Sequence, residues 1–358
     1  MKKLISIRIR LLVPLLFCIC LLGNCDKPFE PVQFKNYPFY ISAVNPSQVF
    51  VFYPATKKLD SIGIPWTPGL GVTPSADGKI LYIPQGSSVL VVDADSFTVM
   101  TQLLYSPLYP VVVSPDDQYL AIAGYDLYII RTSDYSLVFR DTAELLYSEG
   151  SFSSDSKSFY CASTASQGSN FVVSRVDLSD SLFQVTRTPF ADGSVNQVIS
   201  SIDDTKWFLY LAVGLWTYAF EVYDAVQDSI IFRDILVPGA GKMTSSPNGK
   251  YVFYTNPGRS ATDPPSDLSF KIFDVEANMV EAIVSDTNFF CFGTGCAAPK
   301  FLAVTPDSRW LGVLGGDAFQ IPAFYLYDVH KRELVYREIG NFPTTIRQYR
   351  YMSVQFKK

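Results

Sequence analysis

The sequence contains a single histidine, His330, among its 358 residues. Many zinc sites and nucleophilic mechanisms depend on imidazole, which serves as a metal ligand or as a general base near neutral pH. One histidine therefore excludes most histidine-based metal sites and histidine-dependent nucleophilic catalysis. No Cys-x-x-Cys-His segment occurs either, which excludes covalently attached haem. We predict no cofactor, no metal and no catalytic residue.

The chain also has few charges, and they are not predominantly basic. Charged residues make up 18% of the sequence, with 29 basic and 34 acidic side chains. Four of the basic residues lie within the first ten positions, which leaves 25 against 34 in the rest of the chain. A nucleic-acid or anionic-lipid binder needs a basic surface, so these partners are excluded.

The apolar segment Leu11–Leu22 is too short to span a bilayer comfortably, because a membrane helix needs about 20 residues. It follows a basic start and is typical of an export signal. It ends in Leu22-Gly23-Asn24-Cys25, which resembles a bacterial lipobox, although Asn24 departs from the usual Gly or Ala. We therefore expect residues 1–25 to be a signal peptide, Cys25 to be acylated and residues 26–36 to be a tether.

This leader places the protein in the bacterial cell envelope as a membrane-anchored lipoprotein, on either membrane. Two alternatives stay open. The leader could be an ordinary signal peptide cleaved nearby, or an uncleaved anchor.

What the chain has in abundance is aromatic and apolar residues. It contains 27 Phe and 22 Tyr, and apolar residues make up 48%. Aromatic residues favour strands, and this composition can build a large core.

One turn pattern recurs along the chain: Ser or Thr, often followed by Pro, then Asp or Asn, ending in a mostly basic position before an apolar-aromatic run. Pro and Asp supply the chemistry of a tight turn, so each instance predicts a hairpin between two strands. The instances end at Lys79, Gln118, Lys157, Lys206, Lys250 and Arg309, which are 39, 39, 49, 44 and 59 residues apart.

A second pattern follows most of these turns: an alternating strand that ends at Asp. The examples end at Asp93, Asp177, Asp224, Asp274 and Asp328. Four strands in each repeat of this length predict the blade of a β-propeller.

The repeats predict six complete blades, and the segments Pro38–Ser42, Gln48–Tyr53 and Leu59–Ile64 supply three more strands. The last strand, Tyr351–Phe356, has no blade of its own. Because an incomplete ring would expose open sheet edges, we expect this C-terminal strand to complete the first blade. The prediction is an all-β, seven-bladed β-propeller over residues 37–358.

The phrases Val72-Thr73-Pro74, Asp77–Ile83 and Val89–Asp93 resemble the YVTN-repeat family of bacterial seven-bladed propellers. No Gly-His…Trp-Asp signature is present, so a WD40 protein is less expected. The resemblance implies an extracytoplasmic binding or scaffold protein. It does not choose among surface proteins, redox subunits and lactonases, since fold alone does not determine function.

Three long segments should lie on one face of the ring, on blades six and seven: 255–267, 285–300 and 315–322. Long loops on a rigid ring are frequent binding sites, and a mixed polar and aromatic surface suits a protein or a carbohydrate of the envelope. Simple capping of the channel is an equal alternative. The candidate binding residues are Arg259, Asp263, Asp267, Asp286, Phe290, Phe292, Asp317 and Phe319.

Cysteines in an exported chain favour disulfides. Cys291 and Cys296 flank Phe-Gly-Thr-Gly and are expected to form one that shapes the loop. A redox pair is less expected, because the spacing lacks the Cys-x-x-Cys form. Cys161 lies in a predicted strand and should be a buried free thiol.

Other features have simpler explanations. We assign His330 to an exposed turn, the recurrent aspartates to turn capping rather than Ca²⁺ binding, and the segment Val237–Lys242 to a linker.

The function that these features favour is a non-catalytic binding or scaffold propeller that presents the blade-six and blade-seven loops to its partner. A lactonase-like or other hydrolytic propeller, and a docking subunit of a periplasmic redox complex, are the alternatives.

Overall fold

Short antiparallel strands joined by tight turns make up the described part of the chain. The computed structural model describes residues 37–43, 48–56, 58–63, 71–142, 145–165, 171–180, 182–190, 193–214, 217–236, 241–256, 269–285, 291–292, 295–296, 299–315, 323–339 and 349–354. The chain divides into two units, residues 1–35 and 36–358, and all described residues lie in the second. No helix in these ranges is long and apolar enough to cross a membrane.

Five sheets of four strands stand alone. The first sheet consists of β3 (Lys58–Ile62), β2 (Gln48–Tyr53), β1 (Phe39–Ala43) and β30 (Tyr349–Val354). The second consists of β4 (Thr73–Pro74), β5 (Ile80–Gln85), β6 (Ser88–Asp93) and β7 (Val99–Leu103). The third consists of β8 (Val112–Val113), β9 (Tyr119–Ala123), β10 (Leu127–Arg131) and β11 (Leu137–Asp141). The other two consist of β20 (Met243–Ser245), β21 (Tyr251–Asn256), β22 (Ser269–Asp274) and β23 (Met279–Val284), and of β26 (Pro299–Val304), β27 (Trp310–Gly315), β28 (Ala323–Asp328) and β29 (Glu333–Ile339).

Eight further strands form one larger sheet. It contains β12 (Leu145–Phe152), β13 (Ser158–Ala165), β14 (Phe171–Asp177), β15 (Val185–Phe190), β16 (Ser194–Ser200), β17 (Lys206–Ala212), β18 (Tyr218–Asp224) and β19 (Ser229–Leu236). A two-stranded hairpin is formed by β24 (Cys291–Phe292) and β25 (Gly295–Cys296).

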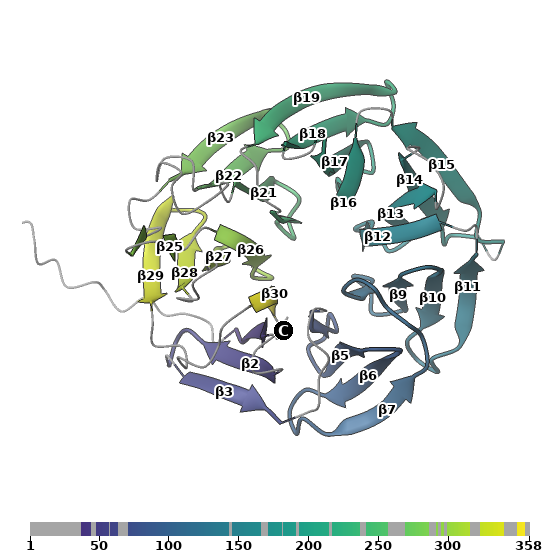
Figure 1. Ribbon diagram of the computed structural model, residues 1–358, viewed down its shortest axis with the longest axis horizontal. Coiled ribbons are helices and arrows are strands. Elements are labelled where there is room, and N and C mark those ends of the chain that lie inside the picture. Colours follow the sequence, from purple (N-terminus) through teal and green to yellow (C-terminus); the bar gives the residue numbers. More distant parts are fainter. Residues whose placement is uncertain are drawn as a thin grey trace, which may run out of the picture. The chain divides into compact units, whose positions relative to one another are not determined.

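The sheets are arranged around a central axis as a β-propeller, with β12, β16, β26 and β30 nearest the axis and strands such as β7, β19 and β29 at the rim (Figure 1). Seven separate blades are not confirmed. A single parallel bridge between Glu149 on β12 and Gln197 on β16 joins two of the expected blades into the eight-stranded sheet.

The C-terminal strand closes the N-terminal sheet, as the sequence predicts. Strand β30 pairs antiparallel with β1, with Phe39 opposite Val354 and Ile41 opposite Met352. One face of this sheet packs on the β26–β29 sheet, where the ring centroids of Phe39 and Phe324 lie 5.1 Å apart. A side chain at Gly312 would collide with the Phe39 ring, so glycine permits this close approach.

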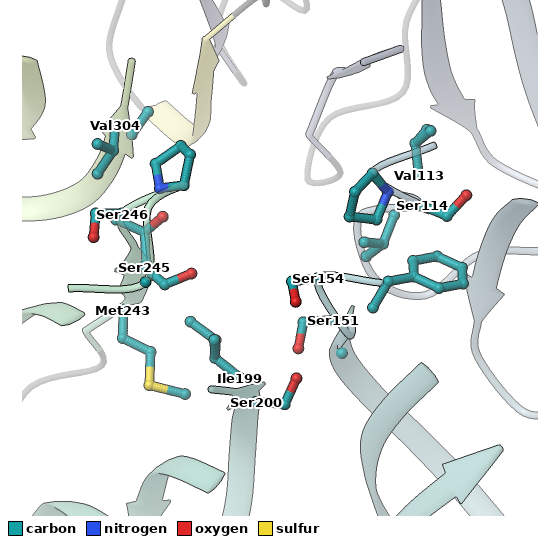
Figure 2. Close-up of a pocket in the computed structure, with 18 of the residues that line it drawn as sticks. Val113, Ser114, Ser151, Ser154, Ile199, Ser200, Met243, Ser245, Ser246 and Val304 are labelled. Carbon is teal, nitrogen blue, oxygen red and sulfur yellow. The ribbon is translucent and has the colours of Figure 1, made fainter. Parts of the chain in front are cut away.

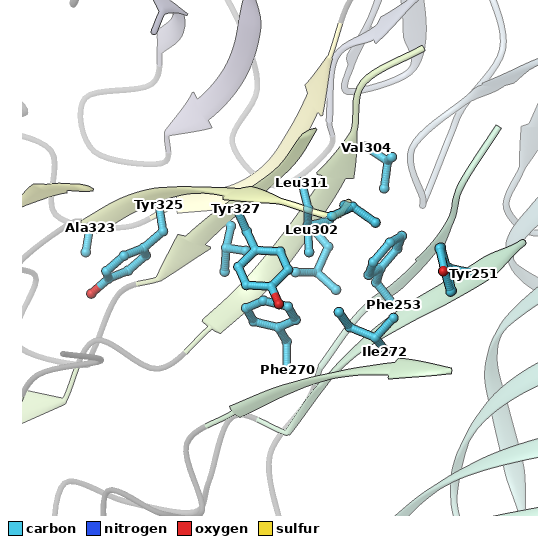
Figure 3. Close-up of a cluster of buried hydrophobic side chains, with 12 residues drawn as sticks. Tyr251, Phe253, Phe270, Ile272, Leu302, Val304, Leu311, Ala323, Tyr325 and Tyr327 are labelled. Carbon is cyan, nitrogen blue, oxygen red and sulfur yellow. The ribbon is translucent and has the colours of Figure 1, made fainter. Parts of the chain in front are cut away.

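The core lies between neighbouring sheets. Figure 3 shows one cluster in which Phe253, Phe270 and Ile272 of the β20–β23 sheet meet Leu302, Leu311 and Tyr325 of the β26–β29 sheet. Comparable clusters join the other consecutive groups of four strands. Each buried Leu or Phe stabilises the fold by about 1.5–3 kcal/mol, which explains the apolar-aromatic composition.

The burial patterns follow the position of each strand in its sheet. All six residues of β27 and of β28 are buried, because those strands are covered on both faces. The rim strand β23 alternates between exposed and half-buried residues, since only one of its faces is covered.

The recurrent turns are capped as predicted. In the turn after β12, the Ser153 hydroxyl donates to Asp155 at 2.8 Å, and the same carboxylate accepts from the Lys157 N–H at 3.0 Å. These bonds hold the pKa of Asp155 below its usual range, led by the Lys157 N–H and followed by the Ser153 hydroxyl. His330 is exposed in a turn where its N–H donates to Asp328, and Cys161 is a buried free thiol.

Candidate functional site

A cavity of approximately 640 Å³ occupies the axis of the propeller. Its wall is built from the inner strands β4, β8, β12, β16, β20 and β26 and from the turns that follow them. Figure 2 shows Met243, Ser245 and Val304 on one wall facing Val113 and Ser151 on the other. Its volume falls within the range of small-molecule sites, about 300–1,000 Å³.

Three polar side chains from neighbouring groups of strands meet in this cavity. Glu149 extends from β12, Gln197 from β16 and Lys242 from the residue before β20. The Lys242 ammonium forms an ion pair with Glu149, and the Gln197 amide donates to Glu149 at 3.3 Å. Only 6% of the Glu149 side chain is exposed, whereas 30% of the Lys242 side chain is. The buried carboxylate therefore holds a cation that reaches the cavity. We call these three residues the polar array.

Gln197 locks the array onto the backbone of β20. Its amide oxygen accepts from the Met243 N–H at 2.9 Å, and its amide nitrogen donates to the Met243 carbonyl at 3.0 Å. This reciprocal pair of bonds fixes the orientation of the amide. The remaining amide hydrogen is thereby directed at Glu149.

Two bulges shape this part of the inner strands. The register of β12 against β13 shifts between Tyr147 and Gly150, and that of β16 against β17 shifts between Val195 and Gln197. A bulge inserts a residue and redirects the neighbouring side chains. Glu149 lies within the first bulge and Gln197 at the edge of the second.

Gly241 brings Lys242 to the cavity. A Cβ at this position would collide with the hydroxyls of Thr255 and Tyr210. Instead the Gly241 N–H donates to the Tyr210 hydroxyl at 3.1 Å, and the Lys242 N–H donates to Thr255 Oγ1 at 2.9 Å. The predicted linker at residues 237–242 thus ends in a residue of the site.

Below the polar array, toward the turns, the cavity is lined by small hydroxyl and apolar side chains. Ser151, Thr244 and Ser245 supply hydroxyls, and Figure 2 shows that of Ser245 directed into the cavity. The Ser151 hydroxyl is buried and has no hydrogen-bond partner in the described part of the chain. Val112 and Ile199 contribute apolar surface at the same level.

The electrostatics at both ends of the cavity reflect burial. Near the array, the pKa of Tyr109 is raised by burial and further by the charge of Glu149. At the turn end, burial raises the pKa of Asp117, although that carboxylate accepts from the N–H groups of Ala76 and Asp77 at 2.5 and 2.8 Å. Asp117 therefore joins one turn to the preceding one. No group of three His, Cys, Asp or Glu side chains that could hold a metal ion occurs among the described residues.

Most of the site residues predicted from the sequence lie outside the described residues. This applies to Cys25 and to the loop residues Arg259, Asp263, Asp267, Asp286, Phe290, Asp317 and Phe319. The backbone of Phe292 lies in β24. The grouping of the three long loops into one binding surface stays a prediction.

The backbone around Cys291 and Cys296 is compatible with the predicted disulfide. The two residues are direct partners in the β24–β25 pair, and Phe292 and Gly295 form the pair next to the connection. In a hairpin with a two-residue connection, the second pair lacks mutual hydrogen bonds and has closely spaced Cα atoms, a spacing that a disulfide can bridge. The bond itself stays a prediction.

Sequence reasoning missed the polar array, although a regularity could have revealed it. Glu149, Gln197 and Lys242 each lie four residues before the capping Ser of the following turn, namely Ser153, Ser201 and Ser246. The corresponding positions in the other repeats hold Gly71, Pro110 and Phe301. Aligning the repeats on their turns therefore places three polar residues at one level of the inner strands.

No protein-family model matches the chain, and no curated protein matches it in sequence. Many solved structures resemble it in fold. A putative 6-phosphogluconolactonase from Bacteroides fragilis has a TM-score of 0.60 at 14% identity, with 91% of this chain and 99% of that chain covered. Hydrazine synthase from Kuenenia stuttgartiensis gives 0.58 at 18% identity over 75% and 80% of the two chains.

A third similar structure is the β-propeller domain of Cps50 (Swd1) from Myceliophteria thermophila, with a TM-score of 0.57 at 11% identity over 75% and 86% of the two chains. Identities this low show the fold alone. The chain has the β-propeller fold, and its structural neighbours include both enzymes and a protein that is not named as one.

Proposed function

We propose that this protein is a non-catalytic binding propeller of the bacterial cell envelope, and that its central cavity holds the ligand. The observation that carries the proposal is the polar array on the wall of a cavity of approximately 640 Å³. A buried charged pair costs desolvation energy that an apolar wall would avoid. A cavity that contains such a pair is suited to recognising a polar ligand.

We further propose that the ring has seven blades of the YVTN-repeat type, with the eight-stranded sheet counted as two. The strand order supports this count, because β15-β14-β13-β12 and β16-β17-β18-β19 are each a complete antiparallel meander. The bridge between them is limited to one residue pair. Each half also bears its own capped turn, closed by Ser153 and Ser201.

The cellular location rests on the leader, with Cys25 as the acylated residue. Tyr37, the first described residue, is buried, and Asp307 of the turn after β26 raises the pKa of its phenol, after burial itself. The propeller therefore begins at the end of the ring where the cavity is lined by turns. Residues 26–36 would span at most roughly 40 Å between a lipid at Cys25 and that end.

A Cys25→Ser variant tests the location. The proposal expects wild-type protein to incorporate labelled fatty acid and to sediment with membranes, and the variant to lose both properties. Continued labelling of the variant would contradict acylation at this residue.

Deliberate blockage of the cavity tests the binding function. Thr244→Phe places a ring on the cavity wall, whereas Thr186→Phe places the same ring on the exposed rim strand β15. The full-length variants and wild type are dialysed against a small-molecule extract of bacterial cells, and enriched compounds are identified by mass spectrometry. We expect wild type and Thr186→Phe to enrich the same compound and Thr244→Phe to lose it. Equal enrichment by all three proteins, or none by any, would contradict the proposal.

An enzyme is the second candidate function, because the similar structures include a putative lactonase and a hydrazine synthase. A hydrolase would consume the enriched compound during dialysis. The same experiment therefore distinguishes the two candidates, since a binding protein leaves the compound intact. The redox-docking alternative predicts that a redox protein from the envelope copurifies with the chain.

A further inference from the structure

We infer that the cavity binds a neutral, hydroxylated ligand of the saccharide class. This inference rests on the proposed binding function and specifies its ligand. Three observations carry it: the charge balance of the polar array, the hydroxyls beneath it and the apolar surface of the neighbouring strand β26.

The first observation is that the charge of the polar array is already balanced, whereas the other carboxylates of the lining, Asp77, Asp116 and Asp117, lie at the turn end of the cavity. The Lys242 ammonium is paired with the buried Glu149 carboxylate, and Gln197 adds a neutral donor to the same carboxylate. A ligand with a net charge would bring an unbalanced charge into a partly desolvated space, which is costly. A neutral ligand can accept a hydrogen bond from the exposed part of the ammonium without that cost.

The second observation is that the cavity offers groups that both donate and accept. Hydroxyls act in both ways, and Ser151, Thr244 and Ser245 line the cavity. The buried Ser151 hydroxyl has no hydrogen-bond partner among the residues that the structure describes, whereas buried polar atoms are ordinarily bonded. Because Ser151 lines the cavity, rotation about its Cα–Cβ bond would present this hydroxyl to a ligand rich in hydroxyls, which could donate to it or accept from it.

The third observation is that the polar array spans three consecutive inner strands, β12, β16 and β20, whereas the next inner strand, β26, contributes apolar residues. The positions that correspond to the polar array on the other inner strands include Pro110 and Phe301, and Phe301 lines the cavity beside Leu302 and Val304. A saccharide ring has hydroxyls at its edge and C–H groups on its faces, so it can contact a polar wall and an apolar wall at once. The cavity volume of approximately 640 Å³ is ample for a sugar of one or two rings.

The test uses three probes that keep the same six-membered ring and differ mainly in charge: glucose, the anionic glucuronate and the cationic glucosamine. Each is titrated into the full-length protein by isothermal titration calorimetry, and maltose is added as a two-ring neutral probe. We expect glucose or maltose to bind at least tenfold more tightly than either charged sugar.

Two conservative variants locate the binding. Ser151→Ala and Thr244→Val each remove one hydroxyl with little change in volume, and each should weaken neutral-sugar binding about two- to tenfold, the usual range for one neutral hydrogen bond. Thr186→Val removes a hydroxyl from the exposed rim strand β15 and should leave binding unchanged. Circular dichroism verifies that each variant is folded.

The outcomes separate this inference from the proposed function. Tighter binding of glucuronate or glucosamine, weakened by Thr244→Val, would overturn the inference of a neutral saccharide and leave the binding function in place. Binding of glucose that neither cavity variant weakens would overturn the inference as well. If no sugar binds and the dialysis experiment still enriches a compound dependent on Thr244, the inference fails alone. If neither experiment detects binding, ordered water alone satisfies Ser151 and both proposals fail.

Discussion

At the scale of single residues, Glu149 is the most buried charged group of the cavity lining. Its side chain is only 6% exposed, and an ionised carboxylate loses much of its hydration there. Lys242 and Gln197 compensate for that loss through an ion pair and an amide bond. Apolar residues of similar size would be at least as stable, so the array points to recognition rather than to folding stability.

Replacing Lys242 alone should therefore lower the free energy of unfolding more than replacing Lys242 and Glu149 together. Lys242→Met leaves the Glu149 carboxylate buried without its cation and should lower the free energy of unfolding by about 3–5 kcal/mol. The double variant Lys242→Met/Glu149→Leu should recover most of this loss. Urea denaturation measures both values.

The exposed pair Lys58–Asp60 provides a control, because its side chains are 65% and 40% exposed. Lys58→Met should leave the urea midpoint unchanged, since exposed pairs contribute little. A double variant less stable than Lys242→Met would show that the array is a net source of stability, contrary to this account.

Two turn aspartates with similar backbones illustrate opposite uses of a carboxylate. Asp117 and Asp204 both have positive φ values, near 60°, which Asn tolerates well. Burial raises the pKa of each. Asp117 accepts two N–H groups of the neighbouring turn. One carboxylate oxygen of Asp204 is buried without a hydrogen bond from the described residues, and bonding by Ser200 and Tyr160 only partly offsets the rise in its pKa.

Replacement by Asn should therefore lower the stability of the protein at Asp117 and raise it at Asp204. Asp117→Asn loses charge-assisted bonds and should cost about 1–2 kcal/mol, whereas Asp204→Asn should raise the urea midpoint at pH 7. Because the folded-state pKa of Asp204 is raised, the ionised Asp204 carboxylate lowers the free energy of unfolding at pH values above that pKa. The penalty disappears as pH falls below the unfolded-state value, about 3.9.

Urea titrations of wild type and Asp204→Asn between pH 7 and pH 4 provide the measurement. The difference in urea midpoint between Asp204→Asn and wild type should shrink as pH falls. A difference that grows toward acid pH would contradict the burial penalty assigned to Asp204.

At the scale of the element, the bulge on β12 determines where Glu149 points. Gly150 follows Glu149, and a Cβ there would collide with the Tyr160 carbonyl oxygen and the Phe159 ring. The bulge therefore needs glycine so that β12 can lie close to β13 while Glu149 faces the cavity.

Gly150→Ala should distort this bulge and destabilise the protein by about 2 kcal/mol or more, since overpacking costs about 1–3 kcal/mol. Gly63→Ala is the matched control, because a Cβ at Gly63 would meet no atom of the described residues within 4 Å. Thermal unfolding of both variants checks the difference. Equal melting temperatures would contradict the assigned role of the bulge.

Elements bounded by turns could be predicted well from the sequence. The expected strand at Val89–Asp93 is β6, Ser88–Asp93, and the strand expected to end at Asp274 is β22, Ser269–Asp274. The Asp at each end caps the next turn and so marks the boundary. The C-terminal strand was expected at 351–356 and lies at Tyr349–Val354, because no turn residue fixes its end.

At the scale of the whole molecule, the ring depends on pairing between its two ends. Strand β30 covers the inner edge of β1, which would otherwise expose unpaired backbone groups to the channel. Such edges favour aggregation, and without β30 the first sheet could unfold independently of the rest of the ring.

Truncation tests this closure. A chain that ends after Gln348 lacks β30 and should unfold at lower urea concentration, with a broader transition and a tendency to aggregate. A chain that ends after Val354 keeps β30 and should unfold like the full protein. Identical transitions for the two truncated chains would show that closure does not depend on this strand.

The site was harder to predict than the fold because it is assembled from residues distant in sequence. Glu149 and Lys242 are 93 positions apart, and their contact depends on two bulges that no local pattern reveals. Loop length directed attention to segments such as 255–267, whereas the polar array lies on strands and next to a linker. The turn-aligned position of its three residues was the available clue.

A crystal structure of the full-length protein grown with glucose would show whether the cavity holds a neutral sugar. We expect sugar density in the cavity, with hydroxyls about 2.7–3.2 Å from the Lys242 ammonium and the Ser151 hydroxyl. A cavity that holds only water, with Lys242 and Glu149 unchanged and glucose bound elsewhere or not at all, would contradict it.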